Sequence, residues 1–116
     1  MSLSVFREAI IPASAGVSNW MDLRGDLVAA ITLPAALTTA TQIVLEHAWL
    51  QDGTGGGPLI VWPDTAQLVI PFTASATILL PAGNWATLGF IRVVAGTSGS
   101  PVAQGAARRF IFGRRP

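Results

Sequence analysis

The stretch "QIVLEHAWLQDGTGGGP", residues 42–58, sets a two-residue alternation directly before a cluster of glycines. Successive side chains of a β-strand point to opposite faces. One face of this stretch then carries Ile43, Leu45, His47 and Trp49, and the other carries Val44, Glu46, Ala48 and Leu50. Glycine permits the backbone angles of a tight turn. The stretch therefore predicts a strand over 42–50 and a hairpin turn over 52–57.

Turn residues recur along the rest of the chain at similar, short intervals. This spacing is typical of an all-β sandwich or barrel, and no segment keeps the 3.6-residue period of a helix. The strands we predict are Val5–Ile11, Ser18–Arg24, Leu27–Leu33, Gln42–Leu50, Pro58–Trp62, Gln67–Phe72, Thr77–Leu80, Ala86–Val94 and Ala106–Phe112. The expected fold is a single-domain antiparallel β-sandwich over 1–116, in which the N-terminal segment and the C-terminal tail can reach neighbouring subunits.

Two of these strands carry distinctive apolar patterns. In Ala86–Val94, Leu88, Phe90 and Val93 cannot all share one face, which predicts either a β-bulge or burial on both faces. In the last strand, Phe110 and Phe112 lie on one side, and Arg109 and Ile111 lie on the other.

The composition is unusually poor in charge for a soluble domain. Charged residues make up 11% of the 116 residues and hydrophobic residues 51%, whereas about 25% charged is usual. A chain with so few charges cannot cover its surface with them. We therefore expect much of that surface to be covered by other protein or by lipid. Two long uncharged stretches are interrupted by turn residues such as Pro34, Pro71 and Pro81, so we expect no membrane span. Arg7 and Glu8 stand where a secretory signal peptide would have its apolar run, so we expect no signal peptide.

The few charges also limit the classes of ligand that we expect the chain to bind. The formal net charge is +1, which favours no general attraction to nucleic acid. All seven basic residues are arginine, and Arg108, Arg109, Arg114 and Arg115 gather at the C-terminal end. We interpret this tail as a subunit contact, with nucleic-acid binding as the alternative. The chain has no cysteine and one histidine, so we expect no metal site and no cofactor.

One short motif raises the question of catalysis. Residues 96–101, "GTSGSP", are similar to the nucleophile segment of trypsin-like proteases, and His47 and then Asp52 or Asp64 precede Ser98 in the order of that family. However, His47 lies mid-strand among apolar residues, and one small domain lacks the second barrel of such a protease. We therefore expect Ser98 to be a turn residue and the protein not to be an enzyme, with a serine hydrolase as the remote alternative.

The four tryptophans, Trp20, Trp49, Trp62 and Trp85, suggest a further alternative. Exposed tryptophans on a β-sandwich can stack against sugar rings, and Trp62 and Trp85 lie near predicted loops. Tryptophan also supplies bulk to cores and interfaces. We expect two or three of the four to serve in the core or at a subunit interface, and keep a glycan-binding module as the alternative function.

Several short motifs together resemble a group of small virion proteins of tailed bacteriophages. The matching residues are Ile31, Pro34, Thr38 and Ala40, then Asp52 and Gly53, then Phe90, Ile91, Arg92, Gly96 and Thr97, and finally Pro101, Val102, Gln104 and Arg108. The strand that ends at Asp52-Gly53 and the strand at 90–94 also resemble those of discoidin-type jelly rolls. The resemblance implies a sandwich of jelly-roll type.

The same resemblance implies a structural role in a virion. We expect a head decoration or head-attached spike or fibre protein, with a tail or baseplate part or a host-attachment module for cell-surface glycan as alternatives. The expected partners are capsid or tail subunits and further copies of the chain. Segment 53–70 is more apolar than in that group, which favours protein contact over a ligand groove. Candidate contact residues are Trp49, Trp62, Trp85, Arg108, Arg109, Arg114 and Arg115.

Overall fold

The structure, a computed structural model, describes residues 6–24, 27–60, 65–79 and 89–115, with only the backbone described at 27–29 and 114–115. The described residues form strands and loops and contain no helix. The strands are β1 Phe6–Ile11, β2 Met21–Asp22, β3 Leu27–Thr32, β4 Gln42–Ala48, β5 Gly57–Pro58, β6 Val69–Pro71, β7 Thr77–Leu79, β8 Phe90–Thr97, β9 Ser100–Pro101 and β10 Arg108–Arg115. The prediction of an all-β chain is confirmed.

The strands pair in a nested series of antiparallel partners. β1 pairs with β10, β2 with β8, β3 with β7, and β4 with β5 and β6. These nested pairs are those of one long hairpin, and the tip of this hairpin is the turn between β4 and β5. Two further pairings, β10 with β3 and β8 with β4, roll this hairpin into two sheets. The sheet orders are β1-β10-β3-β7 and β2-β8-β4-β5, with β6 beside β4 and β9 beside β8.

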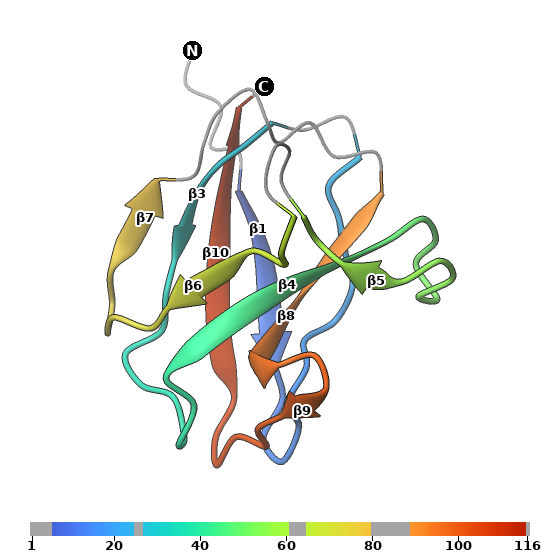
Figure 1. The fold of residues 1–116 in the computed structure, drawn as a ribbon. Helices are drawn as coiled ribbons and strands as arrows, with labels where there is room; N and C mark the ends of the chain where they lie inside the picture. Colours follow the sequence, from blue (N-terminus) through green and yellow to red (C-terminus); the bar gives the residue numbers. More distant parts are fainter. Residues whose placement is uncertain (1–5, 25–26, 61–64, 80–88, 116) are drawn as a thin grey trace.

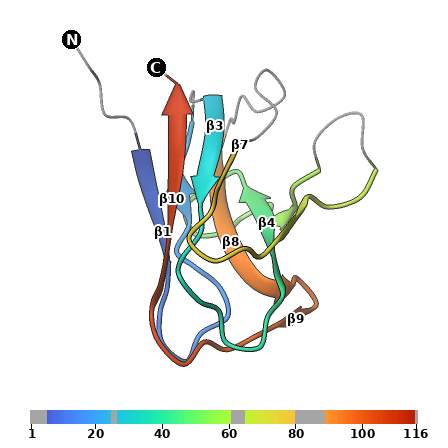
Figure 2. The same cartoon turned by 90° about the vertical axis from the view of Figure 1, so that its left-hand side faces the viewer.

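This arrangement is a jelly roll, as the sequence predicts. The two sheets lie face to face, with β1, β10, β3 and β7 in one layer and β4 and β8 in the other (Figures 1 and 2). The tip of the long hairpin, between β4 and β5, projects from the right of the molecule in Figure 1.

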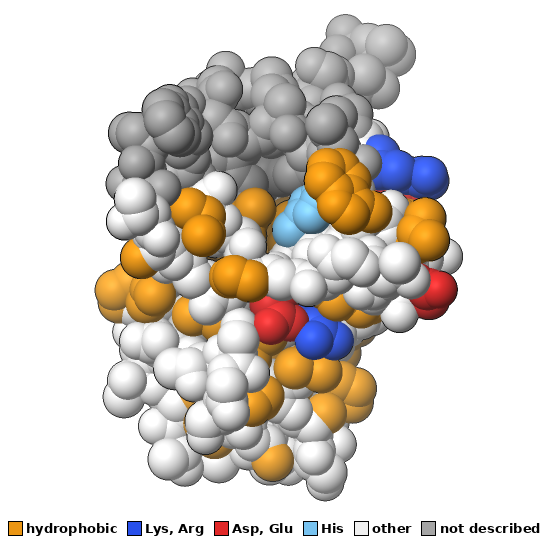
Figure 3. Space-filling view, turned by 45° about the vertical axis from the view of Figure 1, so that its right-hand side comes forward, with side chains coloured by type: hydrophobic (Ala, Val, Ile, Leu, Met, Phe, Trp, Pro, Cys, Tyr) orange, Lys and Arg blue, Asp and Glu red, His pale blue; other side chains and the backbone are white. Residues whose placement is uncertain are grey.

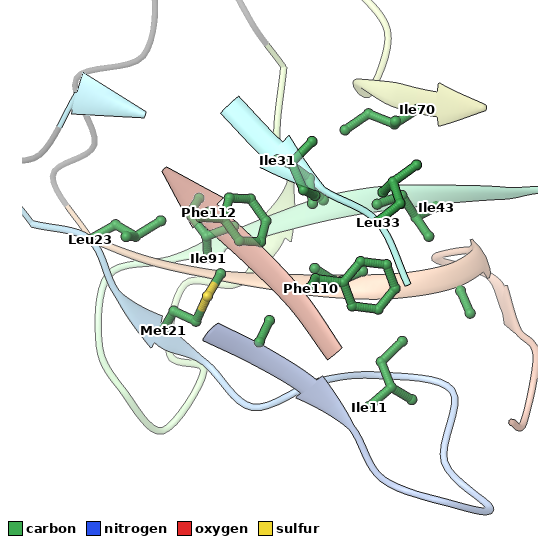
Figure 4. Close-up of a cluster of buried hydrophobic side chains, with 14 residues drawn as sticks. Ile11, Met21, Leu23, Ile31, Leu33, Ile43, Ile70, Ile91, Phe110 and Phe112 are labelled. Atoms are coloured by element: carbon green, nitrogen blue, oxygen red, sulfur yellow. The ribbon is translucent and has the colours of Figure 1, made fainter. Parts of the chain in front are cut away.

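The core fills the space between the two sheets (Figure 4). Phe110 and Phe112 of β10 are fully buried there, while Arg109 on the same strand is exposed, as the alternation predicts. The other buried members of this cluster are Ala9, Ile11, Met21, Leu23, Ile31, Leu33, Ile43, Leu45, Ile70, Ile91, Val93 and Ala95. Every strand contributes at least one of these side chains, except for the short strands β5, β7 and β9.

The strand β8 is buried on both faces. Ile91, Val93 and Ala95 face the core, and Val94 on the opposite face is also fully buried. The register between β8 and β4 is unbroken from Phe90 to Ala95. Of the two predicted alternatives, burial on both faces is therefore confirmed, and no bulge occurs over these residues. The register shift of the described sheets lies instead in β10, between Gly113 and Arg114.

Several predicted strand boundaries are wrong. The strand predicted over Ser18–Arg24 is reduced to β2, and that over Gln42–Leu50 ends at Ala48. The strand predicted over Pro58–Trp62 overlaps β5 only at Pro58 in its described part, and that over Ala106–Phe112 begins at Arg108 and continues to Arg115. The strand predicted to end at Val94 continues as β8 through Gly96 to Thr97. Gly96 has a φ of 92°, so it curls the strand without ending it, and β9 pairs back onto Gly96 and Thr97.

The buried amide of Gln104 joins two loops at one end of the sandwich. Its Oε1 accepts hydrogen bonds from the Thr38 amide at 2.7 Å and from Arg108 Nε at 3.2 Å. Its Nε2 donates to the carbonyl oxygens of Thr38 and Val102 at 3.2 and 3.0 Å. Thr38, Gln104 and Arg108 are among the residues that carry the resemblance to virion proteins, and here they form one hydrogen-bonded cluster with a structural role.

The substitution Gln104→Ala should lower the free energy of unfolding by about 1–3 kcal/mol, because it leaves the amide of Thr38 without its acceptor in a buried site. Urea denaturation measures this loss. Gln51→Ala is the control, since Gln51 is exposed in the hairpin tip. Equal stability of the two variants would show that the Gln104 cluster does not hold the loops.

Candidate functional site

The hairpin tip between β4 and β5 is a compact, hydrogen-bonded loop. Asp52 Oδ1 accepts hydrogen bonds from the amide and the hydroxyl of Thr54, at 2.9 and 2.6 Å. These bonds, the hydroxyl's above all, hold the pKa of Asp52 below its ordinary value, so this carboxyl is ionised at neutral pH. Backbone bonds from Trp49 to Thr54 and from Gly53 to Leu50 close the loop. The predicted turn over 52–57 is thus a hairpin, with Gly57 already in β5.

Two glycines of this loop lie directly against two tryptophans. Gly53, with a φ of 90°, lies beside Trp20, and a Cβ there would be 3.1 Å from the indole nitrogen Nε1. Gly55, with a φ of 75°, lies beside Trp49, and a Cβ there would be 2.6 Å from Cδ1 of that ring. Both positions need glycine for their backbone angle and for the close approach. The loop therefore covers part of each ring.

Beside the loop, an ion pair crosses the outer face of the β4–β8 sheet. Glu46 and Arg92 are direct partners in the register of these strands, and Arg92 Nε donates to Glu46 Oε1 at 2.6 Å. The Arg92 guanidinium lies over the Trp20 ring, 4.4 Å from its centroid. The side chains of Arg92 and Glu46 are 29% and 12% exposed. A half-buried ion pair of this kind holds both charged groups in one geometry.

These groups surround a cleft of about 340 Å³. Its lining residues are Trp20, Glu46, Asp52, Gly53, Gly56, Gly57 and Arg92. Its volume lies at the lower end of the range of about 300–1,000 Å³ that is usual for small-molecule sites. Figure 3 shows this side of the molecule, where charged side chains are few and the single histidine, in pale blue, lies against a large hydrophobic side chain.

Several polar atoms of the cleft residues have no protein partner among the described residues. They are the second carboxylate oxygens of Glu46 and Asp52, the terminal nitrogens of Arg92 and the indole Nε1 of Trp20. The group contains both donors and acceptors. It can therefore bind a ligand by hydrogen bonds of both kinds.

The predicted contact residues are dispersed over the structure. Trp49 is exposed at 56% beside the hairpin tip. Arg108 bonds Thr38 and Gln104 within the chain, and Arg109 pairs with Glu8 on β1. Trp62 and Trp85 lie outside the described residues, as do the side chains of Arg114 and Arg115, whose backbone completes β10 beside β3.

The residues of the protease-like motif are not brought together as a triad. His47 pairs with Ile91 near the start of β8, whereas Ser98 follows the last residue of that strand. At about 3.3 Å a residue, the two positions lie roughly 20 Å apart along the strand. Ser98 forms the turn between β8 and β9 and accepts a hydrogen bond from Gln67 Nε2 at 2.9 Å. Asp64 lies outside the described residues.

The sequence interpretation missed the cleft formed by Trp20, Glu46 and Arg92. A signal was present, since Glu46 and Arg92 each interrupt an otherwise apolar predicted strand. An isolated charge in such a strand needs a partner of opposite sign. The pairing of the two strands with each other, which brings the charges together, was not predicted.

Metal binding and membrane spanning are two further properties that can be judged from the described residues. Among them, no three His, Asp or Glu side chains gather closely enough to bind a metal ion. In the same part of the chain, no helix is both long and apolar enough to span a membrane. Comparison with models of protein families, with curated proteins and with solved structures found no match. The geometry of the chain itself therefore carries the functional argument.

The substitution Gly55→Ala should lower the free energy of unfolding by about 1–2 kcal/mol, because alanine is strained at positive φ. Its Cβ would also displace the Trp49 ring. Gly57→Ala is the matched control, since a Cβ at Gly57 meets no atom within 4 Å. Urea denaturation of both variants measures the difference, and an unaffected Gly55→Ala protein would contradict the packing described for the loop.

Acid should destabilise the fold through His47. Burial lowers the pKa of His47 from its ordinary 6.5, so below that pH the unfolded chain takes up a proton that the folded chain resists. The free energy of unfolding should therefore fall as the pH falls from 7.5 to 5.5. Asp22 and Asp52 stay ionised there, because hydrogen bonds lower their pKa values. Urea denaturation at a series of pH values measures this dependence, and the His47→Gln variant should lose most of it. An unchanged pH dependence in that variant would show that other groups cause it.

Proposed function

We propose that this chain is a non-enzymatic structural subunit that acts by assembling with further copies of itself. In this proposal the assembly is part of a bacteriophage or phage-like particle, first of all a head decoration or head-attached spike or fibre. A tail or baseplate part is the alternative. The exposed apolar face of the β1-β10-β3-β7 sheet carries the proposal.

On that face, one row of residues crosses all four strands. The register places Phe6 of β1 beside Gly113 of β10, Gly113 beside Ala30 of β3, and Ala30 beside Leu79 of β7. Leu79 is 82% exposed and Phe6 is 45% exposed. The row thus has large apolar side chains at its two ends and small residues between them. Ile10, on the same outer face of β1, adds a further exposed apolar side chain.

The charges on this face favour a second copy as the partner. In the next rows Glu8 and Arg109 form an ion pair with each other. Thr32 and Thr77 hydrogen-bond across β3 and β7 at 2.8 Å. The charges of the described side chains in these rows therefore balance, so the same rows of two copies can meet without net repulsion. A two-fold interface buries the same patch of both subunits, which suits a face of this kind.

The assignment to a virion has separate support. The resemblance to small phage virion proteins covers Thr38, Gln104 and Arg108, and these residues meet in one cluster. The jelly roll is also a common architecture of viral shell proteins. A fold alone does not determine function, so the experiments below test assembly and particle association separately.

The two other functions considered from the sequence have less support. The glycan-binding alternative was based on Trp62 and Trp85, which lie outside the described residues. The serine-hydrolase alternative needs His47 and Ser98 within hydrogen-bonding distance, and the strand register separates them. We therefore keep the assembly role as the proposed function.

Leu79→Lys should weaken self-association at least tenfold, because it places a charge in the apolar row. Leu50→Lys is the matched control, since Leu50 is 53% exposed on the hairpin tip, away from this face. Sedimentation velocity over a concentration series measures association, and thermal melts check that both variants fold. A wild-type protein that stays monomeric at every concentration, or equal weakening in both variants, would contradict this interface.

Particle association is measured by density-gradient fractionation of the cells that make the protein. The proposal expects the chain to sediment with assembled particles and to leave those fractions when Leu79 is lysine. Recovery only as free monomer would reject the virion role. Recovery in particles with both lysine variants would keep the virion role and reject the Leu79 face.

A further inference from the structure

We propose that the cleft formed by Trp20, Glu46, Arg92 and the hairpin tip binds a neutral sugar residue. The proposal does not depend on assembly, because the cleft and the apolar row belong to different sheets. It also differs from the sequence-based glycan alternative, because that alternative was based on Trp62 and Trp85, which lie outside the described residues, whereas the groups named here are Trp20, Glu46, Asp52 and Arg92.

The cleft offers a mixture of hydrogen-bond donors and acceptors. Arg92 offers its terminal nitrogens and Trp20 its indole N–H, while Glu46 and Asp52 each offer a carboxylate oxygen. A sugar hydroxyl both donates and accepts a hydrogen bond, and neighbouring hydroxyls can join a carboxylate to a guanidinium. A ring with several hydroxyls is therefore the ligand that satisfies both kinds of group at once.

The described lining residues give the cleft a small negative charge. Arg92 is already paired with Glu46, and Asp52 adds a second negative charge, so the charged groups among these residues sum to −1. Asp52 keeps that charge at neutral pH, because its bonds to Thr54 lower its pKa. Phosphate and carboxylate ligands are disfavoured by this balance. A cation would meet the guanidinium of Arg92, so a neutral polyol fits the cleft best.

The loop backbone lies close to Trp20 at Gly53. This residue has no side chain where it approaches Trp20, and a Cβ would lie 3.1 Å from the indole nitrogen. A larger residue would thus close off the N–H donor. Because the guanidinium of Arg92 lies over the Trp20 ring, Trp20 contributes its N–H and its ring edge, rather than a free stacking face.

The polar groups of the cleft are held in place before any ligand binds. Glu46 and Trp20 both fix Arg92, and Thr54 fixes Asp52. Side chains that are already ordered lose little entropy on binding. A shallow site with few groups should still bind a single sugar weakly, with a millimolar dissociation constant, and several copies in an assembly would strengthen attachment to a glycan surface.

The experiment is a titration of the ¹⁵N-labelled protein, followed by NMR. The probes are free neutral monosaccharides (glucose, galactose, mannose and N-acetylglucosamine), short oligosaccharides of the same units, inorganic phosphate and methylammonium. The expected result is saturable shifts at the Trp20 indole N–H, Gly53 and Gly56 with at least one sugar. A stronger response to an oligosaccharide than to its monosaccharide would identify a glycan chain as the natural ligand, and equal responses a free sugar.

Two substitutions test the named groups. Trp20→Phe removes the N–H and keeps an aromatic ring, and Glu46→Gln removes the charge and keeps an acceptor for Arg92. Each should weaken sugar binding about tenfold, the effect of one lost hydrogen bond. Trp49→Phe is the matched control, because Trp49 does not line the cleft, and its binding should be unchanged. Spectral dispersion confirms the fold of each variant.

The proposal is overturned if no sugar gives saturable shifts at the cleft. It is also overturned if binding survives both Trp20→Phe and Glu46→Gln, or if phosphate or methylammonium binds there and no sugar does. None of these results bears on self-association, which sedimentation measures with the Leu79 variant.

Discussion

In the centre of one sheet, β4 and β8 pair without interruption from Ile43 and Ala95 to Ala48 and Phe90. This register decides which side chains face the core and which face outward. Because side chains alternate with a period of two, a slip of one residue would exchange the two faces of a strand. Glu46 would then turn into the core, and Leu45 would turn outward. The same pairing therefore fixes the apolar interior and, on the other side of the sheet, the ion pair that forms the cleft.

The scarcity of charge explains both surfaces of interest. The chain has seven arginines and six acidic residues. Within the part of the chain that the structure describes, three ion pairs use six of these thirteen: Asp22–Arg24, Glu46–Arg92 and Glu8–Arg109. Exposed pairs contribute little to stability, because water already solvates both partners. The half-buried Glu46–Arg92 pair serves instead to hold a guanidinium over an indole ring. On the outer face of the β1-β10-β3-β7 sheet, the row from Phe6 to Leu79 is apolar, and the proposed assembly is based on this row.

The alternation in Gln42–Leu50 and the positions of Phe110 and Phe112 could be predicted because period-two burial is a local property of a strand. The jelly roll was predicted from the resemblance to known proteins and not from the strands themselves, because the pairing of distant strands leaves no local signal in the sequence. The predicted end of the strand at Val94 was wrong because a glycine such as Gly96 can bend a strand as well as end it, and only the pairing with β9 distinguishes the two. The cleft was missed for a related reason: Glu46 and Arg92 are 46 residues apart, and their meeting depends on which strands become neighbours.

The two proposed surfaces lie on opposite sides of the sandwich, and this separation has a consequence for function. Phe6 and Leu79 lie on the outer face of one sheet, whereas Glu46 and Arg92 lie on the outer face of the other. Subunits joined through the first face would therefore leave the cleft of each copy open to solvent. Weak binding of a sugar by one cleft would then be multiplied by the number of copies, provided that their spacing matches that of the glycans. In such a particle, assembly would supply the avidity that a single shallow cleft lacks.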